Sequence, residues 1–264
     1  MYRVTVVVTS VAHAQLVTFP ASLRPDMPHN DDYTVRVRIP GRGISDHPIR
    51  GIEITDSQNV LIDGITVVNP DLDNVFMRNS DDYIALYNHR WNWWGSSGDI
   101  TVQNSILWAD VAHPINVGGH GDPDSPTGEV IENLIFRNID ILEHDEGTPP
   151  YQGCMAIDCG DENHVRNILF KNIRVESIQE GRLFYVKVHF NEKHDKVPGN
   201  SIDGIPFRNI TYTGIGENPS IIKGLDKERL VKNVTFENVV INVERMKDLK
   251  GVVTNDFIKG IKIK

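Results

Sequence analysis

A short pattern of alternating apolar and polar positions recurs along the chain, and six of its seven copies end in Asn. Each copy places two apolar side chains on one face of a short extended segment, which predicts a strand with one buried side. Self-similarity at intervals of 20–50 residues is typical of a solenoid, a propeller or a repeat array. The copies are residues 59–64, 74–79, 99–104, 133–138, 167–172, 204–209 and 233–238.

The closing Asn of each copy is the position that identifies the architecture. Side-chain amides in register at one turn would form a ladder, each bonded to the coil above and below. A column of Phe would stack inside in the same way. A leucine-rich repeat also places Asn after apolar positions, but its Leu-x-x-Leu-x-Leu spacing is absent. We therefore expect an all-β protein, a parallel β-helix. The ladder would contain Asn79, Asn104, Asn138, Asn172, Asn209 and Asn238, and the column Phe136, Phe170, Phe207 and Phe236.

The beginning of the chain does not follow the repeat. Residues 1–45 are irregular and carry four prolines, so we expect them to cap the open end of a solenoid formed by residues 46–264. The interval from residue 59 to residue 74 is only 15 positions, less than the roughly 18 of the tightest hexapeptide-type coil. Either the copy at 59 is out of register, or part of a coil is missing near residues 70–71.

A second set of strands lies between the repeats, at residues 83–87, 114–118, 154–158 and 185–189. Stacking them in that order leaves a polar outward surface edged by the longest loops, and we expect a functional site there. The outward rows are Ala85, Asn116, Ala156 and Lys187, and Tyr87, Gly118, Asp158 and His189.

The composition and charge of the chain argue against several classes of partner. The net charge is −9 with both signs spread along the chain, which favours neither a nucleic acid nor a membrane surface as a partner. No segment is long and apolar enough to span a bilayer. Residues 1–14 faintly resemble a signal peptide, but polar residues interrupt their apolar run, so a strand or cap is favoured. Cys154 and Cys159 lie five apart on one predicted strand and should not pair.

Asp81 and Asp82 open the first strand of the second set. Adjacent carboxylates cannot both ionise freely, so one pKa should rise toward that of a general acid. Glycoside hydrolysis needs such a pair, an acid for the leaving oxygen and a base for water. The alternative is a solvated Asp-Asp turn. Histidine-containing segments at 144–146 and 161–164 lack the tight spacing of metal ligands, and we expect no metal or cofactor.

Residues 79–85 resemble the Gly-Asp-Asp-Cys-x-Ala region of the polygalacturonases, glycoside hydrolase family 28. Residues 113–119 resemble the His-Gly-Leu-Ser-Ile-Gly-Ser segment of that family, and the chain is also similar to the dextranases of family 49, over roughly residues 50–245. The resemblance implies a right-handed, pectin-lyase-like β-helix that hydrolyses a polysaccharide with inversion, and a secreted or periplasmic location. It makes Asp81 the acid, Asp82 a base and His113 an assisting residue, with His120 a second candidate histidine. His113 could instead only cap its strand.

Two departures from the family pattern alter the expectation. Polygalacturonases carry Arg-Ile-Lys on the next coil, where residues 153–157 offer Met155 and Ile157, and Lys187 follows only a coil later. With the acidic net charge, this favours a neutral glycan over polygalacturonate. A further catalytic Asp is expected one coil before the pair, but Asp71 and Asp73 precede Asp81 by only about ten residues. Either Asp71 substitutes through a bend, or a base is missing.

The segment 89–94 is the densest aromatic cluster of the chain, and its indoles could stack on sugar rings or pack the loop onto the solenoid. Polar side chains of the outward rows and nearby loops complete the expected substrate contacts. A β-helix that binds carbohydrate without cleaving it is the first alternative, and a calcium-dependent polysaccharide lyase the second. The expected substrate-binding residues are Tyr87, Trp91, Trp93, Trp94, Trp108, Asn116, His120, Asp122, Asp158, Lys187 and His189.

Overall fold

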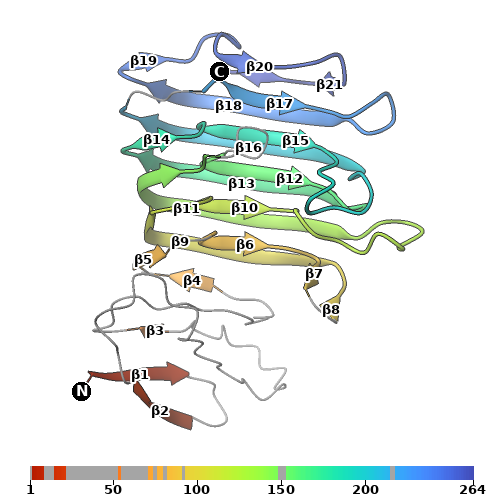
Figure 1. Cartoon of the computed structure of the whole chain (residues 1–264). Coiled ribbons are helices and arrows are strands. Elements are labelled where there is room, and N and C mark those ends of the chain that lie inside the picture. Colours follow the sequence, from red (N-terminus) through yellow and green to blue (C-terminus); the bar gives the residue numbers. More distant parts are fainter. Residues whose placement is uncertain are drawn as a thin grey trace.

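The computed structural model describes residues 2–8, 15–21, 53–54, 71–73, 76–79, 82–90, 93–147, 153–214 and 218–264. Within these ranges all regular elements are strands. Most lie across a stack of parallel coils that ends at the C-terminus (Figure 1). Parallel strands from successive coils, stacked in two large sheets, are compatible with the β-helix that the repeat predicts.

The larger sheet has eleven strands, seven of them along its main path, and contains the described repeats. Its long strands pair in parallel in the order β9, β11, β13, β16, β18. Residues that pair across successive coils are far apart in sequence. Phe136 of β11 lies beside Val102 of β9, and Phe170 of β13 lies beside Phe136, in both cases 34 positions apart. The long strands are β9 (Ser97–Ala109), β11 (Val130–Asp145), β13 (His164–Val175), β16 (Ser201–Tyr212) and β18 (Val231–Ile241). Shorter partners are β4 (Asp71–Asp73), β5 (Phe76–Asn79), β14 (Ile178–Glu180), β19 (Glu244–Arg245), β21 (Ile258–Lys259) and β22 (Lys262–Ile263).

The second sheet has six short parallel strands, and four of them are the strands expected between the repeats. Their order is β20, β17, β15, β12, β10, β6, which follows the stack (Figure 1). The strands are β6 (Ile84–Leu86), β10 (Ile115–Val117), β12 (Met155–Cys159), β15 (Phe184–Val188), β17 (Ser220–Lys223) and β20 (Val252–Val253).

Two small antiparallel groups complete the described strands. One contains β1 (Tyr2–Val8), β2 (Gln15–Ala21) and β3 (Glu53–Ile54). The segment that faintly resembles a signal peptide therefore begins with a strand. The other is a hairpin of β7 (His89–Arg90) and β8 (Trp93–Trp94). Most of the expected cap, residues 1–45, lies outside the described residues, so that boundary stays a prediction.

Each repeat bends the chain at both of its ends through residues in the left-handed conformation. Asn104, Asn138, Asn172, Asn209 and Asn238 have φ between 52° and 55°. From Asn138 onward, the amide of each donates to the Oδ1 of the one before, at 2.9–3.0 Å. The predicted ladder is confirmed for these five positions. Asn tolerates this conformation better than other residues with a Cβ. Both the backbone conformation and the amide hydrogen bonds therefore favour Asn at this position.

The first position of the repeat forms a second ladder that the sequence analysis did not anticipate. Asp99, Asn133, Asn167, Gly204 and Asn233 also have positive φ. Asn133 donates to Asp99 at 3.0 Å, and Asn167 donates to Asn133 at 3.4 Å. Gly204 fits because φ is +75° there, a conformation that glycine adopts without strain.

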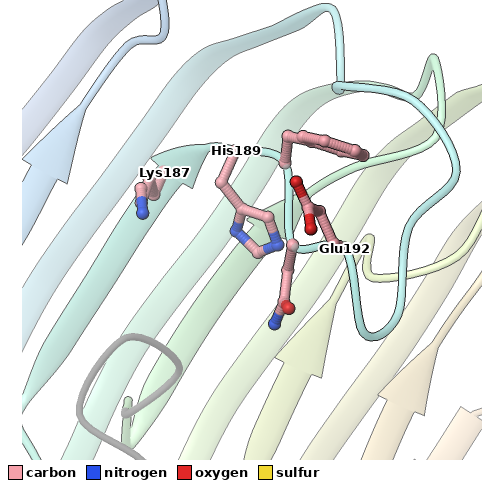
Figure 2. Close-up of a pocket in the computed structure, with 5 residues that line it drawn as sticks. Lys187, His189 and Glu192 are labelled. Carbon is pink, nitrogen blue, oxygen red and sulfur yellow. The ribbon is translucent and has the colours of Figure 1, made fainter.

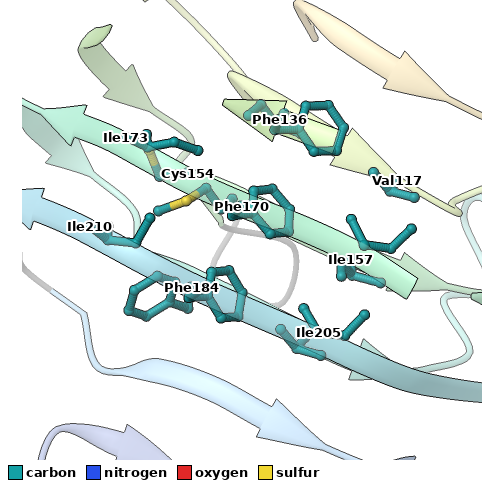
Figure 3. Close-up of a cluster of buried hydrophobic side chains, with 14 of the residues drawn as sticks. Val117, Phe136, Cys154, Ile157, Phe170, Ile173, Phe184, Ile205 and Ile210 are labelled. Atoms are coloured by element: carbon teal, nitrogen blue, oxygen red, sulfur yellow. The ribbon is translucent and has the colours of Figure 1, made fainter. Parts of the chain in front are cut away.

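The interior is a column of stacked apolar side chains. The rings of Phe136, Phe170, Phe207 and Phe236 stack at centroid distances of 4.9–5.3 Å, as predicted. Figure 3 shows Phe136 and Phe170 of this column together with inward-pointing residues of the second sheet, among them Val117, Ile157 and Phe184. Cys154 and Cys159 are both free thiols in this core, and the expectation that they do not pair is confirmed.

The register of the coil before β9 differs from the expectation. Asp71–Asp73 pair with Thr101–Gln103, whereas Asn79 pairs with Ala109. The copy at 74–79 is therefore out of register, because Asn79 lies beside Ala109 and not beside Asn104. The coil from residue 71 to residue 101 has an ordinary length of 30 positions.

A second register error affects the outward rows. Ala156 pairs with Tyr185 and Asp158 pairs with Lys187, so β15 is shifted by two residues from the expected stacking. A shift of two keeps the same face outward, which explains why alternation alone could not detect it. Lys187 consequently lies beside Asp158 rather than beside Ala156.

The Asn ladder predicts a graded stability series at Asn172. Asn172→Ala loses the amide hydrogen bonds and strains φ, so we expect about 2 kcal/mol of destabilisation. Asn172→Gly relieves the strain and should lose only about 1 kcal/mol. Urea unfolding of both variants measures the difference. An Ala variant as stable as the wild type would show that the ladder contributes nothing.

Candidate functional site

The outward face of the six-stranded sheet, with the loops that follow its strands, carries two groups of polar side chains. One surrounds Asp82 before β6, and the other surrounds His189 after β15. These strands are rigidly held by their parallel neighbours, whereas loops supply most of the polar groups. That combination of scaffold and loop is the usual arrangement of a binding or catalytic site.

Asp82 is held by three side chains and one backbone N–H, and we call Asp82, Tyr87, His113 and Asn116 the Asp82 cluster. Its Oδ1 accepts the backbone N–H of His113 at 3.0 Å and lies 2.7 Å from Nδ1 of that ring. Its Oδ2 accepts the amide of Asn116 and the hydroxyl of Tyr87, each at 2.8 Å. The Asp82 side chain is only 12% exposed, and His113 is fully buried.

These contacts fix the charge of Asp82. Burial alone would raise the pKa of Asp82, but the hydrogen bonds and positive charge of His113, together with the amide of Asn116, outweigh it. The pKa of Asp82 therefore lies well below its ordinary value, and the carboxylate stays ionised. Asp82 is not the member of the Asp-Asp pair whose pKa rises. Asp81, the candidate acid, lies outside the described residues.

His144 lies behind His113, with ring centroids 6.2 Å apart. Its Nδ1 lies 3.0 Å from the carbonyl oxygen of Ala112 and donates to it, since a carbonyl only accepts. Burial, reinforced by the charge of His113, lowers the pKa of His144 to about 3. The ring is thus neutral. A Cβ at Gly181 would overlap Nε2 of His144, so the coil above needs a glycine to make room for this ring.

A row of three rings connects the Asp82 cluster with the loop after β15. The ring of His120 packs edge-on against Tyr87 at 4.8 Å, and His194 packs against His120 at 6.3 Å. Asn88 anchors the row because its backbone N–H donates to the carbonyl of His120, and its amide donates to the buried Asn163. The structure therefore places His120, the second candidate histidine, against Tyr87 of the Asp82 cluster.

The second group is a buried histidine between two aspartates. Nδ1 of His189 lies 3.1 Å from Asp158, and Nε2 lies 3.1 Å from Asp195. The contact with Asp158 is one of charge, because its geometry falls outside that of a hydrogen bond. Burial opposes protonation, but the two carboxylates prevail and raise the pKa of His189 to about 9. His189 is thus an imidazolium ion at neutral pH.

Cations gather beside this group. Lys187 is the register neighbour of Asp158 on one side and of Lys223 on the other. Burial, with repulsion from Lys223 and Arg182, lowers the pKa of Lys187, while Asp158 acts against this shift. The outward positions of β12 are Ala156 and Asp158, and Met155 and Ile157 are buried in the core. β12 therefore offers no cation, as expected, but β15 and β17 do.

Several expected site residues lie elsewhere. Trp108 is the penultimate residue of β9 in the other sheet, where its Nε1 donates to Glu143 at 2.6 Å and Arg78 stacks on its ring. Asp71 lies on β4, also in the larger sheet. The position of Asp71 therefore gives no support to a role as base beside Asp82. Asp122 holds a turn by accepting the N–H of Asp124.

The aromatic segment is only partly described. Trp93 and Trp94 form β8, so the expected loop is a hairpin there. Their side chains and the whole of Trp91 lie outside the described residues, and their sugar contacts stay predictions. Asn116 and Asp158 are fully buried, so they hold Asp82 and His189 in place rather than line an open surface.

Sequence reasoning missed Asp195, His194 and Lys223. Asp195 and His194 lie in the loop between β15 and β16, where no periodic pattern exists to place a side chain. Lys223 could have been found by extending the outward rows by one more coil. Within the described residues, no group of three or more His, Cys, Asp or Glu side chains could hold a metal ion, and no helix could cross a membrane.

The raised pKa of His189 predicts a loss of stability in alkali. An imidazolium favoured by the fold stabilises it fully below the unfolded pKa of about 6.5, and this contribution disappears as pH rises through about 9. Thermal or urea unfolding between pH 6.5 and 10 should therefore show a decline of up to about 3 kcal/mol. His189→Asn should flatten this slope. An equally steep decline in the variant would assign it to other groups.

Comparison with known proteins finds one distant likeness to report. In an alignment of 239 positions that covers 77% of this chain, the chain is 21% identical to the protein named "Probable endopolygalacturonase D" of Neosartorya fischeri. The chain spans about half the length of that relative (46%). No protein-family model matches the chain, and no solved structure matches it significantly. The likeness supports a polygalacturonase-like glycoside hydrolase at most, and it gives no support to the resemblance to dextranases.

Proposed function

We propose that the chain is a right-handed parallel β-helix hydrolase that cleaves glycosidic bonds of a polysaccharide with inversion. The observation that carries the proposal is the Asp82 cluster, an ionised carboxylate held on the outward face directly after Asp81. Two neighbouring carboxyl groups with different pKa values are what glycoside hydrolysis requires. The likeness to a protein named as an endopolygalacturonase points to the same class of reaction.

In the proposed mechanism Asp81 protonates the leaving oxygen, and Asp82 supplies fixed negative charge. That charge stabilises the oxocarbenium-like transition state, and the hydrogen bonds from His113 and Asn116 keep the carboxylate oriented for it. Asp82 also accepts the proton of the attacking water at Oδ2, after this water displaces one of the present donors. The hydroxyl of Tyr87 is the donor that a water or substrate hydroxyl can replace, because Asn116 and His113 are fully buried.

The geometry of this face changes the expectation about the charge of the substrate. The absence of a cation on β12 favoured a neutral glycan. However, Lys223 and Arg182 lie close enough to Lys187 for their repulsion to help burial lower its pKa. Partly desolvated cations attract carboxylates strongly. We therefore propose that the face accepts a uronate-containing glycan as well as a neutral one.

A β-helix that binds carbohydrate without cleaving it is the second candidate. The observation that favours it is that each oxygen of Asp82 already has two donors or close polar partners, which fills the lone pairs a base would use. A calcium-dependent lyase gains no support, because a carboxylate cluster for the ion is not found among the described residues. A secreted or periplasmic location remains the proposal implied by the resemblance.

Substitution of the two aspartates tests the proposed chemistry. Asp81→Asn and Asp82→Asn should each lower the release of reducing ends by at least the ~10²-fold typical of a lost acid or base. Asp110→Asn is the matched control, since Asp110 pairs with the exposed Arg78. Circular dichroism confirms that each variant folds. Near-full turnover in Asp81→Asn would remove that residue from the mechanism, and absence of turnover in the wild type would favour the binding protein.

Salt dependence tests the charge of the substrate. Polygalacturonate should bind more weakly as salt screens its contacts with Lys187 and Lys223, whereas a neutral glucan should not respond. Lys187→Met should weaken binding of the acidic polymer alone, with Lys171→Met on the exposed surface of β13 as the control. Calorimetric titration measures both. If the wild type and Lys187→Met bind polygalacturonate with equal affinity, Lys187 does not bind the acidic polymer, and a neutral substrate is again favoured.

A further inference from the structure

A pocket of about 280 Å³ opens at the end of β15, away from the Asp82 cluster. Its lining is Lys187, His189, Phe190, Asn191 and Glu192. Figure 2 shows Lys187, His189 and Glu192 gathered where β15 passes into the following loop. Neither the roles proposed for the Asp82 cluster nor the packing of the core explains this hollow.

The loop that forms the wall is held in one conformation. Asp195 accepts the backbone N–H of Asn191 at 2.8 Å while it contacts His189. Asp161 accepts the N–H groups of Lys196 and Val197, at 2.7 and 3.2 Å. The loop closes where the N–H of Gly199 donates to the carbonyl of His189. A wall fixed by buried charges before a ligand arrives lowers the entropy lost on binding.

The lining combines an aromatic ring with polar groups. Phe190 is 43% exposed although it is a large apolar side chain next to a rigid sheet. An exposed ring beside hydrogen-bonding groups fits a ligand with one apolar face and a polar rim. A pyranose ring has this character, because its axial C–H groups form a face and its hydroxyls form the edge. Asn191 and Glu192 can bond hydroxyls, and Lys187 can bond a hydroxyl or a carboxylate.

We propose that this pocket is a distal saccharide subsite, in which Phe190 stacks on one sugar ring of a chain that also reaches the Asp82 cluster. The proposal rests on the proposed function, since it assigns the far end of the same substrate. β15 is three strands from β6 in the sheet, so the two places are separated by at least about 14 Å. The row of Tyr87, His120 and His194 lies between them. Only an oligosaccharide spans that distance, so the subsite selects for chain length.

Chain-length dependence tests the subsite. Binding of an octasaccharide and a disaccharide of galacturonate, and of the matching gluco-oligosaccharides, is measured by calorimetry in an Asp81→Asn background that suppresses turnover. We expect Phe190→Ala to weaken octasaccharide binding about tenfold and to leave disaccharide binding unchanged. Phe190→Tyr keeps the ring and should retain the affinity. Phe76→Ala, which removes a ring that is 59% exposed on β5, is the control for loss of an exposed aromatic side chain.

The outcomes separate the subsite from the catalytic proposal. If Phe190→Ala loses octasaccharide binding but keeps disaccharide binding, and the wild type hydrolyses nothing, the subsite is supported and the proposed hydrolase activity is wrong. If the wild type hydrolyses the polymer and Phe190→Ala binds the octasaccharide as tightly as its parent, the subsite proposal is wrong and the hydrolase proposal stands. Loss only with the acidic or only with the neutral series would identify the sugar that the pocket takes. Equal losses for both chain lengths would show that Phe190 acts near the reacting bond, and the distal assignment would be wrong.

Discussion

The paired left-handed turns of each repeat are the constraint on which the rest of the structure depends. At both ends of the six-residue unit the chain bends sharply through a residue with φ near +55°. Asn adopts this conformation at low cost and uses its amide to bond the same residue of the next coil. Conformation and hydrogen bond thus require the same amino acid at the same place. Successive coils are locked in register by these ladders, and the Phe column can then stack inside.

Register in the larger sheet determines what the smaller sheet can present. Since β11 and β13 are fixed by two ladders each, the strands β10, β12 and β15 that lie between the repeats stack in parallel with one face inward. Of their outward side chains, Lys187 is partly exposed, whereas Asn116 and Asp158 are buried and hold Asp82 and His189 in place. The loops add Tyr87 and His120 to this face. A rigid row of strands with polar loop residues at its edge suits a long, repetitive ligand.

Buried charge is used differently in the two polar groups of this face. At Asp82, the ring of His113 and the amide of Asn116 stabilise a carboxylate that remains partly accessible. At His189, two carboxylates stabilise an imidazolium that is almost wholly buried, and the loop from His189 to Gly199 is tied to it. The first arrangement keeps a charge available to a ligand. The second uses charge to hold a wall in place, which is why Phe190 and Asn191 are the side chains left to face a ligand there.

The sequence by itself determined the all-β repeat, the Asn ladder, the Phe column and the four strands of the outward face, because these depend on local alternation and on residues with special backbone preferences. The family resemblance implied that His113 and His120 lie near Asp82. Only the tertiary structure decided the register of β4 and β15, and for β15 the reason is that a shift of two residues preserves the alternation that a sequence pattern reports. The same is true of Asp195 and Lys223, whose partners are distant in sequence. Contacts between coils follow from how long each loop is and where it folds back, and no periodicity encodes that.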